Sequence, residues 1–201
     1  MTQIQKFKVK ITGIRPLIMH NGRLADPLDP ASRRLAEFTG KRKKTQEDHE
    51  GMAEAEWDGG LYTANGRVVI PGDVLDSCMR DGGKAARKGK AIVAGVSIVE
   101  SEAILDYDGP TDYNKLYEIT LPDGRRKFSD RRGVGIQKAR IMRTRPRFNE
   151  WSATFHVERY DFAEVSASDI KKALDTAGVA VGLLEHRPKF GLFTVDEFKQ
   201  V

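Results

Sequence analysis

The sequence predicts an α+β protein with an antiparallel sheet, in the strand–helix–strand–strand–helix–strand order of a ferredoxin-like fold. Two observations predict it. Residues 6–12 and 149–160 alternate between apolar and polar side chains, as half-buried strands do. Residues 71–83 and 166–178 have the 3.6-residue apolar spacing of helices that cover one face of a sheet.

A chain of 201 residues is long enough to bury one core. We therefore expect residues 1–201 to form a single domain. Two long polar segments, at about 21–60 and 105–149, interrupt the order of core elements, and we interpret both as insertions. Within the first insertion, residues 31–38 and 45–57 are candidates for helices.

The two alternating segments predict the composition of each sheet face. In the first, Phe7, Val9 and Ile11 alternate with lysines, and in the second Trp151 shares phase with the buried positions. The opposite face is predicted to be open, polar and basic. Its expected residues are Lys6, Lys8, Lys10, Ser152, Thr154, His156 and Tyr160.

Turn residues and helix-boundary residues predict the elements between these strands. Asn65-Gly66 predicts a tight hairpin turn between residues 61–64 and 67–70. Pro71 is expected as the first helical residue, and Gly82-Gly83 as the stop of that helix. The buried face of the helix is expected to contain Val74, Leu75, Cys78 and Met79.

The remaining core elements follow in order. The apolar, β-branched residues 91–104 predict a buried strand. Ser166, with Asp169 three residues later, predicts a capped helix that ends at Gly178. Residues 190–195 are expected to form the closing strand.

Charge is concentrated in one segment. Residues 125–147 contain ten basic residues and a single acid, Asp130, which is a net charge of +9. The rest of the chain carries −4, so that the total is +5. Arginine is suited to bidentate contacts with phosphate and to stacking on bases, so this segment predicts a nucleic-acid-binding finger.

Three arginines of this finger alternate at Arg143, Arg145 and Arg147, which places them on one face at strand spacing, about 7 Å apart. Pro146 favours an edge strand or an extended loop over a central strand. Phe148 and Trp151 follow and are candidates for stacking on bases, although the phase of Trp151 is that of the core.

Residues 70–80, Ile-Pro-Gly-Asp-Val-Leu-Asp-Ser-Cys-Met-Arg, resemble a signature of the RAMP superfamily, which includes the backbone subunits of CRISPR effector complexes. In that family a hairpin leads into Ile-Pro-Gly, and a leucine and an arginine follow where Leu75 and Arg80 stand. Asp73 and Val74 depart from the usual serines. Residues 182–191 occupy the place of the family's glycine-rich loop but are poor in glycine.

The resemblance covers the core, about half of the chain. We expect a protein that binds RNA in preference to DNA and is not a catalyst. The resemblance implies binding of single-stranded RNA or DNA along a groove. It also implies assembly along the strand as a homo-oligomer or as a subunit of a larger ribonucleoprotein. The predicted nucleic-acid-binding residues are Arg131, Arg132, Lys138, Arg140, Arg143, Arg145, Arg147, Arg80, Lys84 and Arg187.

Two alternatives remain open. One is a RAMP-type endoribonuclease that uses Asp26 and Asp29, as some related backbone subunits do, or His186 as a general acid or base. The aspartates also suit a proline-rich turn. The other is an accessory or decoy subunit whose basic segment docks on an acidic protein partner. No motif predicts a metal ion or a cofactor.

Other features limit the class of protein. Cys78 is the only cysteine, so neither an internal disulfide nor a cysteine-rich zinc site is expected. No apolar run approaches the roughly 18 residues of a membrane-spanning helix, and the first residues do not resemble a signal peptide. We therefore expect a cytoplasmic protein that does not enter a membrane.

Overall fold

The computed structural model describes residues 3–136 and 139–201, and it is an α+β protein with antiparallel sheets. The chain divides into two compact units. The first comprises Met1–Leu17, Arg67–Asp108 and Asn149–Val201, and the second comprises Ile18–Gly66 and Gly109–Phe148. The second unit is thus assembled from two segments that are far apart in the sequence.

The sheet of the first unit has the order β10-β1-β9-β6-β4, with the short strand β5 also paired to β9. Where pairing is resolved between these strands it is antiparallel. Their bounds are β1 (Ile4–Gly13), β4 (Arg67–Pro71), β5 (Val96–Ile98), β6 (Glu102–Tyr107), β9 (Trp151–Tyr160) and β10 (Phe193–Gln200).

The two central strands form the core as their alternation predicts. Phe7 lies opposite Val157 and Val9 opposite Phe155, and all four side chains are buried. Trp151 is also buried, and its indole Nε1 donates a hydrogen bond to the carbonyl oxygen of Arg15 at 2.8 Å. Trp151 is therefore a core residue and not a base-stacking one.

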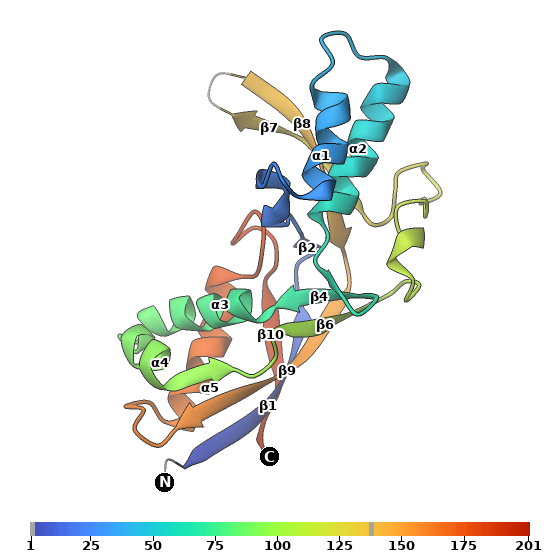
Figure 1. Cartoon of the computed structure of the whole chain (residues 1–201). Coiled ribbons are helices and arrows are strands. Elements are labelled where there is room, and N and C mark those ends of the chain that lie inside the picture. The colour runs from blue at the N-terminus through green and yellow to red at the C-terminus, as the bar shows by residue number, and fades with distance from the viewer. Residues whose placement is uncertain (1–2, 137–138) are drawn as a thin grey trace. The chain divides into compact units, whose positions relative to one another are not determined.

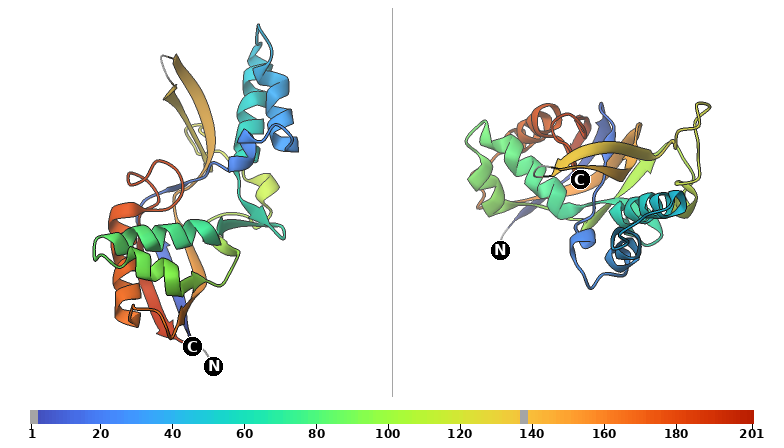
Figure 2. Two further views of the ribbon diagram at one scale, coloured as in Figure 1. Left: turned by 60° about the vertical axis from the view of Figure 1, so that its left-hand side comes forward. Right: turned by 90° about the horizontal axis from the view of Figure 1, so that it is seen from above.

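Three helices, α3 (Gly72–Lys84), α4 (Gly89–Gly95) and α5 (Ala167–Thr176), lie on one face of this sheet (Figures 1 and 2). The prediction of a strand over 91–104 is wrong in its first part, because α4 occupies that stretch and the chain becomes extended only at β5. An apolar run of this length suits a buried helix as well as a strand, and packing against α3 selects the helix here.

The glycines predicted to end helices serve close packing instead. Helix α3 continues through Gly82 and Gly83 to Lys84. A Cβ atom at Gly82 would lie 2.1 Å from the carbonyl oxygen of Ala173 in α5, and one at Gly83 would lie 2.4 Å from the Ile92 side chain in α4. The two glycines allow three helices to approach one another, which helix-stop rules do not anticipate.

The helical path that begins with α5 also continues past the glycine that was predicted to end it. Helix α5 continues past Gly178 into a π-helical turn, η3 (Ala177–Val181), and the helical path ends at Gly182 with φ of 78°. A Cβ atom at Gly178 would lie 2.3 Å from the carbonyl oxygen of Phe193. The closing strand β10 consequently starts three residues later than predicted.

The second unit contains two α-helices, η1 (Gly22–Ala25), η2 (Tyr113–Lys115) and a three-stranded sheet of order β2-β8-β7. Its helices are α1 (Pro30–Thr39) and α2 (Gln46–Gly60), which pack on each other. Thr45 and Asp48 form a capping box at the start of α2, and this explains why so polar a segment is helical. The strands are β2 (Leu17–Ile18), β7 (Ser129–Ile136) and β8 (Ala139–Phe148).

Aromatic side chains form the core of the second unit. The indole Nε1 of Trp57 donates to the carbonyl oxygen of Phe128 at 2.8 Å, and the Trp57 and Tyr117 ring centroids are 5.2 Å apart. Phe148 is 0% exposed and contacts Phe128. The prediction that Phe148 stacks on bases is therefore wrong, because it holds the base of the β7–β8 hairpin together.

The structure confirms the prediction for Asn65-Gly66 and contradicts the one for Pro146. Asn65 and Gly66 both have positive φ (50° and 74°) between β3 (Thr63–Ala64) and β4, as the Asn-Gly pair predicts. Pro146, in contrast, lies on the central strand of the three-stranded sheet, not on an edge. Its carbonyl oxygen, which proline retains, accepts the amide of Met19 at 3.0 Å, so the missing N–H is no obstacle there.

Candidate nucleic-acid interface

The β7–β8 hairpin contains most of the predicted binding residues. In its antiparallel register Arg132 lies opposite Arg143, and Asp130 opposite Arg145. Arg143, Arg145 and Arg147 occupy alternate positions of β8, as expected from their spacing. Lys138 lies outside the described residues.

Some of these arginines have contacts within the protein. Nη1 of Arg143 forms an ion pair with Oε1 of Glu56 at 2.6 Å, and Glu56 Oε2 accepts the amide of Thr144 at 2.8 Å. The Glu56 side chain on α2 is only 5% exposed. Arg145 is 7% exposed. Arg143 and Arg145 thus join β8 to the interior of the unit. Arg145 has little access to a ligand, whereas the Arg143 side chain remains 28% exposed.

Asp130, the single acid of the basic segment, has a similar role. It is buried and forms an ion pair with Arg132 and, at 3.8 Å, with Arg147. One carboxylate therefore faces two guanidinium groups in that cluster. Arg132 and Arg147 remain about one third exposed.

Other cations of the segment face solvent. Arg131 and Arg140 are exposed, and within the described part of the chain neither has an ion-pair partner. Arg125 is 77% exposed, and its guanidinium group forms an ion pair with an accessible acid, Asp123, at 2.6 Å. These three arginines can exchange water for phosphate at little cost to the fold.

Four arginines surround one cavity in the second unit, which we term the arginine pocket. It has a volume of about 300 Å³ and is lined by Arg125, Arg126, Arg131 and Arg147, together with Ala53, Tyr117, Ser129, Asp130 and Thr144. The Arg126 guanidinium carbon lies 3.9 Å from the centroid of the Tyr117 ring, a cation–π contact that holds it in place. Asp130 is the acid in the lining, and Asp123 and Glu118 outside it pair with Arg125 and Arg126 at 2.6 and 3.5 Å. Four guanidinium groups against these three carboxylates leave the pocket weakly positive, which favours an anion.

The sequence indicates only part of this pocket. Arg125 and Arg126 belong to the basic segment but are not among the predicted binding residues, and neither is Tyr117. The adjacent pair Arg125-Arg126 is a visible signal. The position of Tyr117 beneath Arg126 depends on the loop around η2, and no local pattern predicts it.

Arg80 and Lys84 lie on the first unit, at the end of α3. Both contact Asp81, at 3.3 and 2.7 Å, and the hydrogen bond from Lys84, assisted by Arg80, holds the pKa of Asp81 below its usual range. Arg80 and Lys84 also line a cavity of about 510 Å³ with Arg87, Gly89, Lys90 and Val93. Arg87 and Lys90 were missed, although five basic residues and one acid between positions 80 and 90 are a usable signal.

Arg187 and His186 also lie on the first unit, in the loop that follows η3. They line a cavity of about 600 Å³ together with Asp81. His186 has a positive φ of 56° and its ring contacts Phe190. Burial raises the pKa of the nearby Cys78 thiol to about 12, against the opposing charge of Arg187. The predicted binding residues are therefore distributed over both units.

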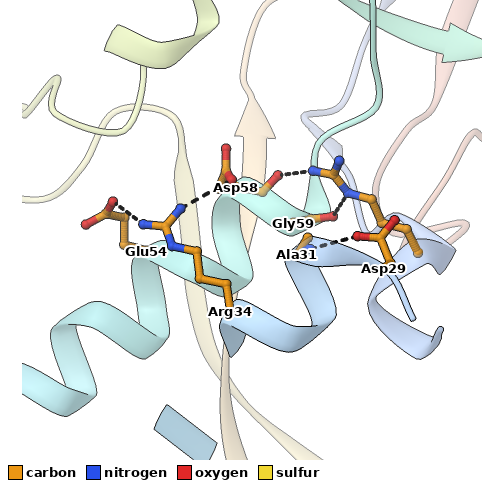
Figure 3. Close-up of polar contacts among 7 residues, drawn as sticks. Asp29, Ala31, Arg34, Glu54, Asp58 and Gly59 are labelled. Carbon is orange, nitrogen blue, oxygen red and sulfur yellow. Dashed lines mark hydrogen bonds and ion pairs between the residues drawn. The ribbon is translucent and has the colours of Figure 1, made fainter. Parts of the chain in front are cut away.

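The candidate catalytic aspartates have local structural roles. The carboxylate of Asp29 accepts the amide of Ala31 at 2.8 Å and caps α1 (Figure 3). Asp26 accepts the amide of Leu28 at 2.9 Å. Beside them Arg34 bridges Glu54 and Asp58. Within residues 3–136 and 139–201, no group of three or more His, Cys, Asp or Glu side chains could hold a metal ion. The turn interpretation accounts for both aspartates.

The open sheet face is not basic as predicted. Lys8 forms an ion pair with Glu197 at 3.2 Å, Lys6 lies opposite Glu158, and His156 Nδ1 is 2.6 Å from Glu100 Oε1. Alternation predicted which β1 and β9 side chains share this face, but not that acids from neighbouring segments would balance its lysines. Acidic side chains therefore offset part of the positive charge of this face.

Comparison with protein-family models finds no match, and comparison with curated proteins finds none. Among the described residues, no helix combines the length and apolar character needed to cross a bilayer. The functional argument consequently depends on the geometry and charge of the two units.

Proposed function

We propose that this protein binds single-stranded nucleic acid, RNA in preference to DNA, through the arginine pocket and the exposed arginines of the β7–β8 hairpin. The observation that carries the proposal is the convergence of Arg125, Arg126, Arg131 and Arg147 around one cavity. Guanidinium groups match phosphate bidentately and are weakly hydrated, so a cluster of them favours phosphate over isolated carboxylates.

The architecture of the first unit supports a ferredoxin-like core as part of this proposal. Strands β1 and β6 are both antiparallel to β9, which lies between them, and α3 and α4 fall between β1 and β6 in the chain. Strands β9 and β10 are related in the same way across β1, with α5 between them in sequence. Two interleaved split βαβ units of this kind are the ferredoxin-like pattern.

The resemblance to the RAMP superfamily agrees with this core. Gly72 of the Ile-Pro-Gly motif starts α3 where a Cβ atom would lie 2.1 Å from the carbonyl oxygen of Glu100, a position that only glycine fits. The resemblance adds assembly of several copies along one strand to the proposal. A size-exclusion elution volume that long oligonucleotides leave unchanged would contradict that assembly.

The test is fluorescence anisotropy with labelled single-stranded RNA, single-stranded DNA and duplex across a salt series. The variant is the triple change Arg125→Ala, Arg131→Ala and Arg140→Ala, which removes exposed cations and spares the buried ion pairs of Arg143 and Arg147. For a single strand the log–log salt slope is about −0.7 per phosphate contact, so loss of three contacts should flatten it by roughly 2.

The matched control removes three exposed lysines from the first unit: Lys10→Ala, Lys172→Ala and Lys199→Ala. It changes the net charge equally but leaves the arginine pocket intact, so its salt slope should equal that of the wild type. If the wild type binds no strand at low salt, the proposal fails, and docking of an acidic protein partner becomes the better explanation of the basic segment. Equal slopes for both triple variants would show that binding is not localised at the hairpin.

A further inference from the structure

A second cavity of about 380 Å³ adjoins the arginine pocket in the second unit, and we term it the apolar pocket. It lies between the helical pair α1–α2 and the β7–β8 hairpin, and Figures 1 and 2 show these two pairs alongside each other. Its apolar lining comes from Leu35, Met52, Ile141 and Met142. Ile141 and Met142 are 37% and 48% exposed. Exposed apolar side chains that lie together on a charged hairpin often mark a binding site.

Arg131 lines both cavities. A ligand that spans the two cavities would therefore contact Arg131 from both. The polar groups at the apolar pocket are mostly basic, with Lys44, His49, Arg131 and Arg143 against Glu56. Glu56 is already neutralised by Arg143, so no uncompensated acid repels an anionic ligand there.

We infer that the apolar pocket receives an unpaired nucleobase of the strand whose phosphate the arginine pocket holds. The inference rests on the proposed function. It adds that a nucleobase is the group bound in the apolar pocket. A base has apolar faces and polar edges, which fit Leu, Ile and Met side chains and a basic rim, respectively. Methionine sulfur also makes favourable contacts with aromatic rings.

This arrangement selects for single strands. A base that is paired and stacked in a duplex cannot enter the apolar pocket, between the α1–α2 pair and the β7–β8 hairpin, without being extruded from the duplex. Extrusion costs a few kcal/mol. An unpaired base pays much less for leaving its neighbours. The apolar pocket therefore supplies a discrimination against duplex that the arginine pocket, which contacts phosphate alone, cannot supply.

The experiment compares two labelled RNA strands of equal length and charge, one intact and one whose central nucleotides are abasic. Wild-type protein should bind the abasic strand about tenfold more weakly, with the same salt slope, because the phosphates are unchanged. Met142→Ser should weaken binding of the intact strand by a similar factor and leave binding of the abasic strand unaltered. Met142→Leu, which keeps the apolar contact, should behave as the wild type.

Val99→Ser is the matched control, since it removes a comparably exposed apolar side chain from the first unit, and it should bind both strands as the wild type does. Thermal unfolding of each variant verifies that the fold is retained. If the wild type binds the intact and abasic strands equally, the base pocket is wrong while the arginine pocket stands. If it binds neither strand, the proposed function fails and this inference fails with it.

Discussion

Glu56 divides the arginines of the β7–β8 hairpin into two groups. Its buried carboxylate accepts from Arg143 and from the amide of Thr144, and in this way it anchors the strand to α2. Arg131 and Arg140 on the same hairpin lack such an anchor among the described residues and face solvent. Identical side chains on one hairpin therefore have different surroundings, some anchored to the interior and others open to solvent.

Replacing Glu56 with alanine should lower the free energy of unfolding by about 2–3 kcal/mol. The change leaves the Thr144 amide unsatisfied in the interior and Arg143 without its partner, and removal of one member of a buried pair is costly. Urea denaturation followed by circular dichroism measures the loss. Because the exposed arginines remain in place, binding of single strands to the folded variant should keep its salt slope.

Glu54→Ala on the same helix is the control. Glu54 pairs with Arg34 on the surface, where both side chains are nearly half exposed, so the change should cost at most about 1 kcal/mol. Equal losses for the two variants would contradict the anchoring role of Glu56.

At the scale of elements, the α3–α5 contact depends on a glycine within a helix. Replacing glycine with alanine in a helix ordinarily stabilises by up to about 1 kcal/mol. Gly82→Ala should instead destabilise by roughly 2 kcal/mol or more, because the new Cβ atom would meet the backbone of Ala173 at 2.1 Å and α5 must shift. Thermal or urea denaturation gives the sign directly.

Gly22→Ala is a suitable comparison, since a Cβ atom at Gly22 would meet no other atom within 4 Å and the φ of this residue is one that alanine accepts. That variant should change stability by no more than about 0.5 kcal/mol. A stabilising effect of Gly82→Ala would show that the helices pack less closely than the structure has them.

At the scale of the whole molecule, the two units contain separate basic surfaces. Arg87 and Lys90 belong to the first unit and are exposed beside the cavity formed with Arg80 and Lys84. If this surface also contacts the strand, Arg87→Ser with Lys90→Ser should flatten the salt slope by about 1.4, the sum for two phosphate contacts. The salt series described for the hairpin variants measures it.

This effect should add to that of Arg125→Ala, Arg131→Ala and Arg140→Ala, because each phosphate contact contributes its own increment to the salt slope. A slope identical to that of the wild type would mean that the first unit makes no phosphate contact. The hairpin of the second unit would then account for binding by itself.

Local patterns determined much of this protein. Alternation placed Phe7, Val9 and Phe155 in the core of an antiparallel sheet, and Asn65-Gly66 identified the tight turn, because both depend on the backbone period and on φ preferences of a few neighbouring residues. The concentration of arginine in residues 125–147 was equally visible. Residues 91–95 were misassigned because an apolar run has no period that separates strand from helix.

Only the tertiary structure decided which of those arginines are available to a ligand. The packing of α2 on the hairpin brings Glu56 to Arg143, and the pairing of β7 with β8 brings Asp130 to Arg147. The roles of Gly82 and Phe148 were settled in the same way, by neighbours from other segments. Sequence patterns determine the elements and their charge because these are local properties, whereas burial and ion pairing arise from contacts between segments that no local pattern specifies.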